Sequence, residues 1–289
     1  MPSPLHRLLL VLLLYTTTTT ITTTTKLSCH ALSSQPAVQQ PPRTYHYFAF
    51  GSNMCTSTMT NLRNLSPLAS TAAVLPCHEL RFNIPGIVGI EPSSASVEPV
   101  EVTIASDNGR GEDDWIEEMV TNDQVVHGTL YTLDERDFAT ICQTEGVPFV
   151  YSLHRCRVIP YVGDGRRAGI TSLKQVLWET LSMDAKGADG NKNSHSTTTT
   201  TTTKRITNSI LQTHNRGIPA FTLRATHKQW RTMPDIPPSQ SYLNVLLRGA
   251  MEYHLDEAYV TKLRNVKVGK TWVGDGLAEE MLRWAERRK

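Results

Sequence analysis

The stretch Tyr47-Phe48-Ala49-Phe50-Gly51-Ser52-Asn53-Met54 sets an aromatic, apolar run directly against three turn-forming residues. Aromatic residues favour a half-buried strand and Gly-Ser-Asn is turn chemistry, so the stretch predicts a strand and a tight loop. The polar segment from Cys55 to Asn64 is compatible with a following helix. Such a loop offers backbone N–H groups to an anion or a carbonyl oxygen, and Gly51 lets the backbone approach a ligand closely. On spacing alone, an ordinary strand–helix connection capped by Ser52 or Asn53 is favoured.

Length and charge narrow the classes of protein that fit. The chain has 289 residues, a formal net charge of +2 and a pI near 8.3. That length is enough for a sizeable core. The near-neutral charge lacks the basic excess typical of nucleic-acid-binding proteins, so no nucleic-acid partner is predicted. The five cysteines are irregularly spaced and predict neither a zinc site nor a disulfide framework.

Residues 1–42 are predicted to be a targeting segment and a disordered linker. His6 and Arg7 precede an apolar run from Leu8 to Tyr15, and no Asp or Glu occurs before Glu79. These features are typical of a secretory signal, and the acid-poor, Thr-rich continuation also fits transit to an organelle such as a plastid. The apolar run is too short to span a membrane, so no stable membrane insertion is expected. If the segment is not used, a cytoplasmic protein is expected.

One predicted helix carries an unexpected acid. The helix runs from Glu135 to Gln143, and its apolar stripe comprises Phe138, Ile141 and Cys142. The next position on that face is Glu145, so a carboxylate stands where a core residue is expected. Burial and the helix dipole both disfavour its negative charge, which suits a group that moves protons. Fraying of the helix end, with Glu145 turned to solvent, fits the residues equally well.

Three later segments complete the organisation of the chain. A helix is predicted from Gln240 to His254, and spacing alone favours Tyr242 as an ordinary core tyrosine on its apolar stripe. Residues 164–217 contain the run Thr197–Thr203, and such homopolymers bury too little apolar area to offset the entropy of ordering. This insertion is therefore predicted to be largely disordered. The tail, residues 267–289, is predicted to be helical.

Three segments resemble motifs of the γ-glutamylcyclotransferase family, in the family's order. Residues 48–54 are similar to its Tyr-Gly-Ser-Asn-Leu signature, with Phe50 and Met54 in place of Tyr and Leu. Glu145-Gly146-Val147 resembles its Glu-Gly-Val segment, and Pro238-Ser239-Gln240-Ser241-Tyr242 resembles its Pro-Ser-x-x-Tyr segment. Together the three matches are far more specific than any one of them.

The resemblance implies an α+β fold, a γ-glutamylcyclotransferase-like small mixed β-barrel with flanking helices, in a catalytic domain at residues 43–266. The barrel strands are expected at residues 45–50, 80–84, 125–133, 149–162 and 218–225. The loop after the first strand, the helix end at Glu145 and the helix start at Tyr242 are then expected to meet at one mouth.

The resemblance also implies an activity of the lyase or acyltransferase type, within glutathione metabolism and the γ-glutamyl cycle. A γ-glutamyl amino acid or amine is cleaved to 5-oxoproline and a free amino acid or amine, with Glu145 as the catalytic acid/base. The residues implied to bind this small-molecule substrate are Phe50, Gly51, Ser52, Asn53, Met54 and Tyr242. No cofactor and no metal are implied.

Alternatives to this activity stay open. One is a glutathione-specific cyclotransferase, although those relatives use a different loop that lacks the counterpart of Asn53. The other is a non-catalytic binding module on the same fold, against which a retained Glu145 on a buried stripe argues. Residues 219–223 lack the polar groups of the family's Arg-Ser-Tyr-Leu-like strand, which leaves the substrate's outer contacts open. A homodimer is also left open.

Overall fold

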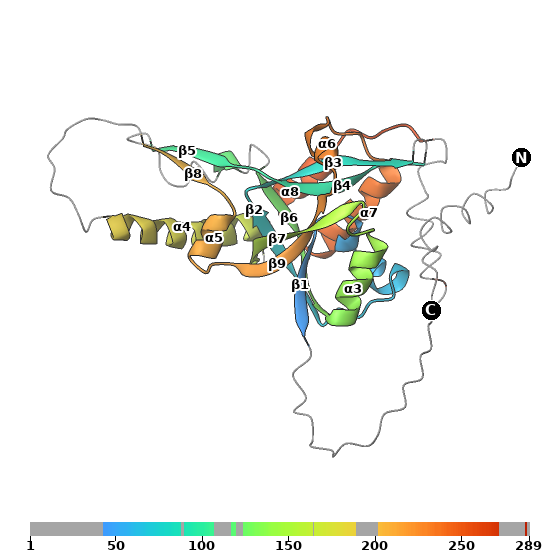
Figure 1. The fold of residues 1–289 in the computed structure, drawn as a ribbon, viewed down its shortest axis with the longest axis horizontal. Coiled ribbons are helices and arrows are strands. Elements are labelled where there is room, and N and C mark those ends of the chain that lie inside the picture. Colours follow the sequence, from blue (N-terminus) through green and yellow to red (C-terminus); the bar gives the residue numbers. More distant parts are fainter. Residues whose placement is uncertain are drawn as a thin grey trace, which may run out of the picture. The chain divides into compact units, whose positions relative to one another are not determined.

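Five strands close into a barrel in the computed structural model (Figure 1). Their order is β1 (Thr44–Ala49), β6 (Val125–Asp134), β2 (Ala69–Pro76), β7 (Tyr151–Pro160) and β9 (Ile218–Ala225). β1 runs antiparallel to β6, and a parallel pairing of Tyr47 with Phe221 joins β1 to β9. The barrel is therefore mixed, and helices flank it. The predicted α+β barrel fold is confirmed.

The structure describes residues 43–87, 90–106, 117–119, 124–163, 165–188, 202–271 and 287. The described part from Arg43 onward belongs to one folded unit. The predicted targeting segment and nearly all of the predicted C-terminal helix lie outside the described residues.

One predicted barrel strand is wrong. Residues 80–84 lie in β3 (His78–Ile87), which pairs with β4 (Glu91–Pro99) in a separate two-stranded sheet. The barrel position belongs to β2, which pairs with β6 along its length, from Ala69 opposite Thr132 to Pro76 opposite Val125. The sequence Ala-Ser-Thr-Ala-Ala at the start of β2 is weakly strand-forming, and only long-range register reveals its partner.

The main helices agree with the predicted positions. α3 (Glu135–Thr144) begins at Asp134, whose carboxylate accepts the backbone N–H of Asp137 at 2.7 Å. α7 (Gln240–Glu252) begins at Ser239, whose hydroxyl accepts the backbone N–H of Tyr242 at 2.9 Å. Each side chain satisfies one of the free N–H groups of the first helical turn. Two further short helices are α6 (Lys228–Thr232) and α8 (Glu257–Arg264).

The expected disorder of residues 164–217 is wrong for much of that insertion. It contains α4 (Ala168–Ala188), α5 (Ser209–Thr213) and β8 (Thr202–Ile206), which pairs with β5 (Val102–Ser106). Ile170, Leu173 and Leu177 of α4 are buried in a second core cluster with residues of β2 and β7. Their i, i+3, i+7 spacing gives α4 an apolar face, and each buried side chain contributes about 1.5–3 kcal/mol. Residues 189–201 lie outside the described part of the chain.

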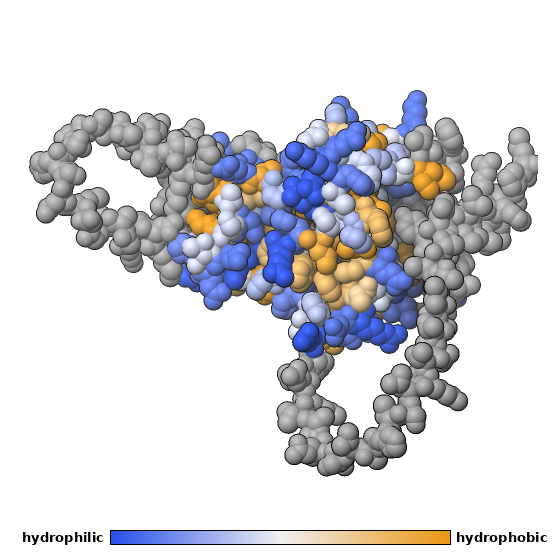
Figure 2. Space-filling model, in the orientation of Figure 1, coloured by the Kyte–Doolittle hydropathy of each residue, from blue (hydrophilic) through white to orange (hydrophobic). Residues whose placement is uncertain are grey.

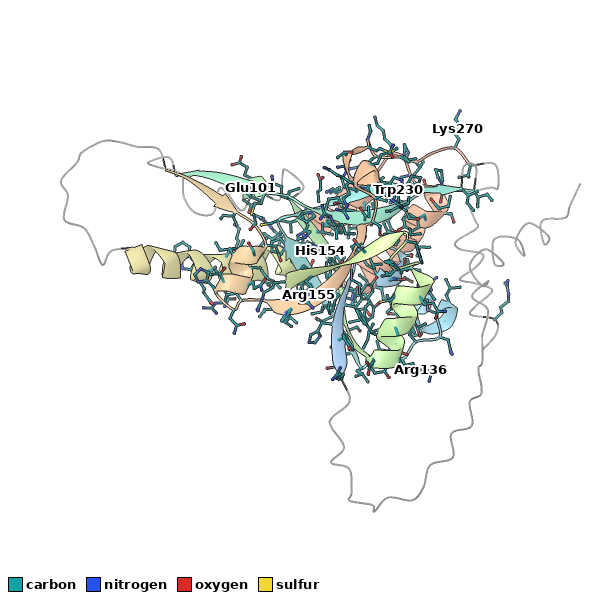
Figure 3. The ribbon with its side chains drawn as sticks, in the orientation of Figure 1. Glu101, Arg136, His154, Arg155, Trp230 and Lys270 are labelled. Atoms are coloured by element: carbon teal, nitrogen blue, oxygen red, sulfur yellow. The ribbon has the colours of Figure 1, made fainter. Side chains whose placement is uncertain are left out.

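The main core lies inside the barrel and under α3 and α7. Phe48 and Ala49 are fully buried, so both faces of β1 are covered. In Figure 3 the side chains crowd around the barrel, whereas Arg136 on α3 and Lys270 lie at the outside. Figure 2 shows hydrophilic residues interleaved with smaller apolar areas on this face. Among the described helices, none has the length and apolar character to cross a membrane.

Candidate active site

The loop after β1 continues into two short helical turns. The first is a 3₁₀ turn, η1 (Ser52–Met54), and the second is a wider π-type turn, η2 (Thr58–Leu62). They replace the single helix expected from Cys55 to Asn64. The backbone N–H of Arg63 closes the π-type turn on the carbonyl of Thr58 at 3.0 Å. Isolated π turns occur frequently at functional sites, and this one directs the chain so that Arg63 faces α3.

Two glycines bring α7 close to this loop. A Cβ at Gly249 would lie 2.7 Å from both the Cβ of Met54 and the backbone nitrogen of Cys55. A Cβ at Gly51 would lie 3.0 Å from the hydroxyl oxygen of Tyr242. Larger residues would separate the helix from the turn. The close approach therefore holds the start of α7 against the Gly-Ser-Asn turn.

Asn53 is the centre of a polar network. Its side chain is buried, and Nδ2 donates to the hydroxyl of Tyr47 at 3.0 Å and to Oε1 of Glu145 at 2.9 Å. Its Oδ1 accepts the Nε–H of Arg63 at 2.8 Å. Arginine has no acceptor, so Oδ1 must face Arg63 and the amide orientation is fixed.

Glu145 caps the C-terminal end of α3 and turns inward. Its side chain is 13% exposed, and Oε1 also accepts Nη2 of Arg63 in an ion pair. Nη1 of the same guanidinium donates to the hydroxyl of Thr144. The carboxylate therefore lies against the turn, and not in solvent as fraying of the helix end would have left it.

Two tyrosine hydroxyls face this carboxylate. The hydroxyl oxygen of Tyr242 accepts the backbone N–H of Ala95 at 3.2 Å and that of Ser52. Burial raises the pKa of Tyr242 well above its ordinary value, and the negative charge of Glu145 raises it further. Burial likewise raises the pKa of Tyr47, again with a contribution from Glu145. Both hydroxyls therefore keep their protons at neutral pH and are available as donors.

The sequence-predicted residues divide into two groups. Asn53, Glu145 and Tyr242 come together with the backbone of Gly51 and Ser52. Phe50 and Met54 are instead 3% and 0% exposed, and their side chains anchor the loop in the hydrophobic core.

Sequence reasoning missed Arg63 and Tyr47. Tyr47 precedes the turn on β1, and its aromatic ring suggested only a strand residue. Arg63 contacts Glu145 across 82 positions, and nothing in its local sequence indicates that partner. The only local signal was a basic residue at the end of an otherwise uncharged segment.

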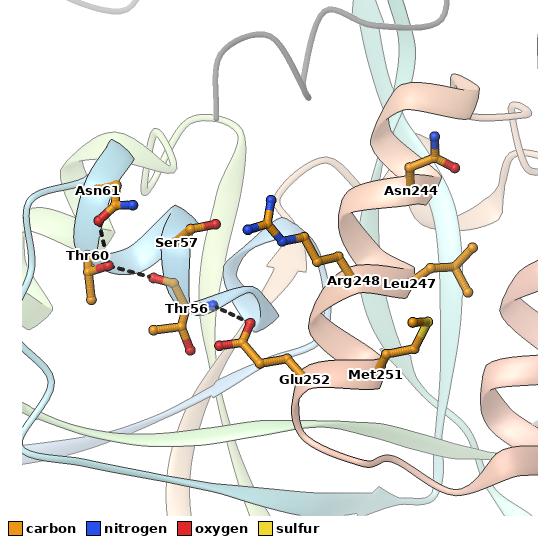
Figure 4. A pocket seen from close by; sticks show the side chains of 9 residues that line it. All are labelled: Thr56, Ser57, Thr60, Asn61, Asn244, Leu247, Arg248, Met251 and Glu252. Carbon is orange, nitrogen blue, oxygen red and sulfur yellow. Dashed lines mark hydrogen bonds between the residues drawn. The ribbon is translucent and has the colours of Figure 1, made fainter. Parts of the chain in front are cut away.

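An open groove lies on the other side of this loop (Figure 4). Its volume is about 810 Å³, and it runs between η2 and the outer face of α7. The backbone N–H of Thr56 donates to Glu252 across it at 3.1 Å. Neither Asn53, Glu145 nor Tyr242 lines the groove, so it is distinct from the polar network. Among the described residues, no group of three or more His, Cys, Asp or Glu side chains is arranged to hold a metal ion.

Comparison with known proteins identifies the family. A protein of Clonostachys rogersoniana named γ-glutamyl cyclotransferase verK is 33% identical over 136 residues, which are 46% of this chain and 72% of that protein. The chain belongs to the γ-glutamyl cyclotransferase family. The predicted resemblance is thus confirmed, and the chain is a member of a family of enzymes.

A second γ-glutamyl cyclotransferase relative, gliK of Aspergillus fumigatus, is 33% identical over 115 residues, or 40% of each chain. A solved structure of a γ-glutamyl cyclotransferase aligns over 85% of this chain and 99% of its own, with a TM-score of 0.47 and 14% sequence identity. No family model matches the chain.

Proposed function

We propose that this protein cleaves γ-glutamyl amino acids or amines to 5-oxoproline and a free amino acid or amine, with Glu145 as the general acid/base. The observation that carries the proposal is the contact of 2.9 Å between Asn53 Nδ2 and Glu145 Oε1. It joins the Gly-Ser-Asn turn to a partly enclosed carboxylate close to the hydroxyl of Tyr242.

The reaction requires little machinery because nucleophile and electrophile belong to one molecule. The α-amine attacks the γ-carbonyl carbon, the ring C–N bond forms, and the original amide C–N bond breaks. Holding the substrate in a ring-closing conformation supplies much of the acceleration. One proton must leave the amine and one must reach the departing nitrogen. Glu145 accepts the first and returns it to the leaving group, so the carboxylate is regenerated and the protons balance.

The turn and Tyr242 supply the donors. Backbone N–H groups of Gly51, Ser52 and Asn53 hold the glutamyl carboxylate or the developing oxyanion as donors fixed in advance. The N–H of Ser52 is directed at the hydroxyl of Tyr242. A substrate oxygen entering there takes its hydrogen bond from the same pair of groups. Tyr242 keeps its proton, and its O–H donates to the substrate.

The test is release of 5-oxoproline by the full-length protein. γ-Glutamyl-alanine, a γ-glutamyl amine and glutathione are compared in one assay. We expect release from the first two, and a loss of about 100-fold or more in Glu145→Gln. Glu135→Gln removes an exposed carboxylate from the same helix and is the matched control. Turnover of glutathione alone would favour the glutathione-specific alternative, and tight binding without turnover would favour a binding module.

A further inference from the structure

The guanidinium of Arg63 has three different acceptors in the network. Nε donates to Asn53 Oδ1 at 2.8 Å, Nη1 to the hydroxyl of Thr144 and Nη2 to Glu145 Oε1. Its side chain is 13% exposed, the same as that of Glu145. We propose that Arg63 is a positioning residue that presents Oε2 of Glu145, and not Oε1, to the substrate. This inference rests on the proposed function, because it assigns the oxygen that moves the proton.

The two carboxylate oxygens have unequal surroundings. Oε1 accepts hydrogen bonds from both Asn53 and Arg63, which occupy its two lone pairs. No group in the described part of the chain donates to Oε2. An oxygen already holding two donors has no lone pair left for the proton that the substrate's α-amine gives up. Oε2 is therefore the oxygen able to receive that proton.

Arg63 acts on Glu145 by two routes. It holds Oε1 directly, and through its bond to Oδ1 it fixes the amide of Asn53, the second donor to Oε1. Thr144, the residue before Glu145, accepts a hydrogen bond from the same guanidinium and so links it to the last turn of α3. The carboxylate is thus fixed by donors from η1 and from the residue after η2, and α3 in turn holds the guanidinium. Because the carboxylate is already oriented, no entropy is lost in orienting it during the reaction.

Charge supports the same assignment. The groups that face Glu145 are Arg63 after η2, Asn53 in η1, Tyr47 on β1 and Tyr242 on α7. Of these only Arg63 is ionised at neutral pH, because burial keeps both tyrosines protonated. Its cation lies against the carboxylate, so it holds Glu145 by charge as well as by hydrogen bonds.

The test compares Arg63→Gln and Arg63→Lys in the full-length protein, with 5-oxoproline release from γ-glutamyl-alanine as the readout. In Arg63→Gln we expect kcat to fall about 10- to 100-fold with KM changed less than about threefold, because orientation is lost and binding is not. Arg63→Lys keeps the charge but loses the planar fork of donors, so kcat should stay low while KM again changes little.

A matched control is Arg81→Gln. Arg81 also holds three acceptors, on Asp235, Glu79 and the carbonyl of Met233, but they lie away from the network. The Arg81→Gln variant should keep wild-type kcat and KM. If the wild-type protein releases no 5-oxoproline, the proposed function fails and this inference fails with it.

Other outcomes separate the two proposals. If the wild type is active and Arg63→Gln keeps its kcat, or raises KM alone, the positioning role is wrong while the function stands. Should Arg63→Gln not fold, Arg63→Lys decides, since a wild-type kcat in that variant would also overturn the role.

Discussion

The amide nitrogen Nδ2 of Asn53 lies 2.9 Å from Oε1 of Glu145, although 92 positions separate the two residues in the chain. The turn after β1 positions the amide, and the C-terminal end of α3 positions the carboxylate. The same nitrogen donates to the hydroxyl of Tyr47, and Arg63 holds the amide oxygen. Rotation of the amide would break all three bonds. The contact therefore couples the turn to the helix end as one unit.

Replacing Asn53 with Asp removes both N–H donors and sets a second carboxylate beside Glu145. Like charges at hydrogen-bonding distance oppose each other, and the fixed orientation of Glu145 is lost. We expect kcat/KM for 5-oxoproline release to fall about 100-fold, or roughly 2.7 kcal/mol. Asn61→Asp makes the same chemical change in η2 and should retain wild-type kcat/KM. Equal losses at the two positions would contradict a specific role for the contact.

Gly51→Ala should lower activity through Tyr242. The new Cβ would lie 3.0 Å from the hydroxyl oxygen, tighter than an ordinary contact, so the tyrosine must shift away from the substrate. Tyr242→Phe removes that oxygen and leaves the N–H groups of Ala95 and Ser52 without their acceptor. The double variant should be no less active than Tyr242→Phe alone, a coupling of about 1 kcal/mol or more in kcat/KM. Strictly additive losses would show that the methyl group acts elsewhere.

Gly249→Ala tests the contact between α7 and the loop. Within an exposed helix this change stabilises by up to about 1 kcal/mol. Here the Cβ would lie 2.7 Å from Met54 and from Cys55. The cost of overpacking should therefore exceed the gain in helix propensity and lower the free energy of unfolding by about 1–3 kcal/mol. Gly165→Ala, where nothing lies within 4 Å, should change little. Urea midpoints of the two variants decide, and a stabilised Gly249→Ala would refute the tight contact.

Local patterns were enough to predict part of this architecture. The apolar stripe of α3 indicated that Glu145 continues the buried face, and the carboxylate does point inward. The turn residues after β1 indicated the loop, and α3 and α7 begin at the predicted residues, directly after the caps Asp134 and Ser239. These features depend on neighbours within a few positions, where periodicity and capping preferences act.

The rest depends on contacts between distant segments. β2 consists of small residues at its start, so its strand pattern is weak, and its eventual partner β6 lies far along the chain. Arg63 reaches Glu145 only after η2 and α3 have packed on the same barrel. In α4, the stripe of Ile170, Leu173 and Leu177 is regular, but it lies in the same insertion as the run Thr197–Thr203. The composition of the insertion therefore predicted too much disorder, because a few buried apolar side chains are enough to order a helix.

Acid pH should destabilise the fold through a buried histidine. His127 on β6 is 3% exposed; its Nδ1 pairs with the hydroxyl of Tyr161, and its ring packs on that of Tyr259 at 4.8 Å. Asp256 lies 4.0 Å from Nδ1, but its oxygens are held by backbone N–H groups at the start of α4. Burial and, to a lesser extent, the nearby charge of Lys262 lower the pKa of His127 from 6.5 to about 3. The neutral ring is thus a requirement of the folded state.

The sign of the pH dependence follows from proton binding. Below pH 6.5 the unfolded chain protonates His127 whereas the folded protein does not until about pH 3. The free energy of unfolding should therefore fall with pH across that window, by up to about 1.4 kcal/mol per pH unit. Urea midpoints at pH 7.5, 6 and 5 measure the slope, and His127→Gln should flatten it. Some slope should remain, because burial also lowers the pKa of His78 to about 4. His227→Gln, at an exposed position, should leave the slope unchanged, and an equally steep slope in His127→Gln would exclude His127 as its source.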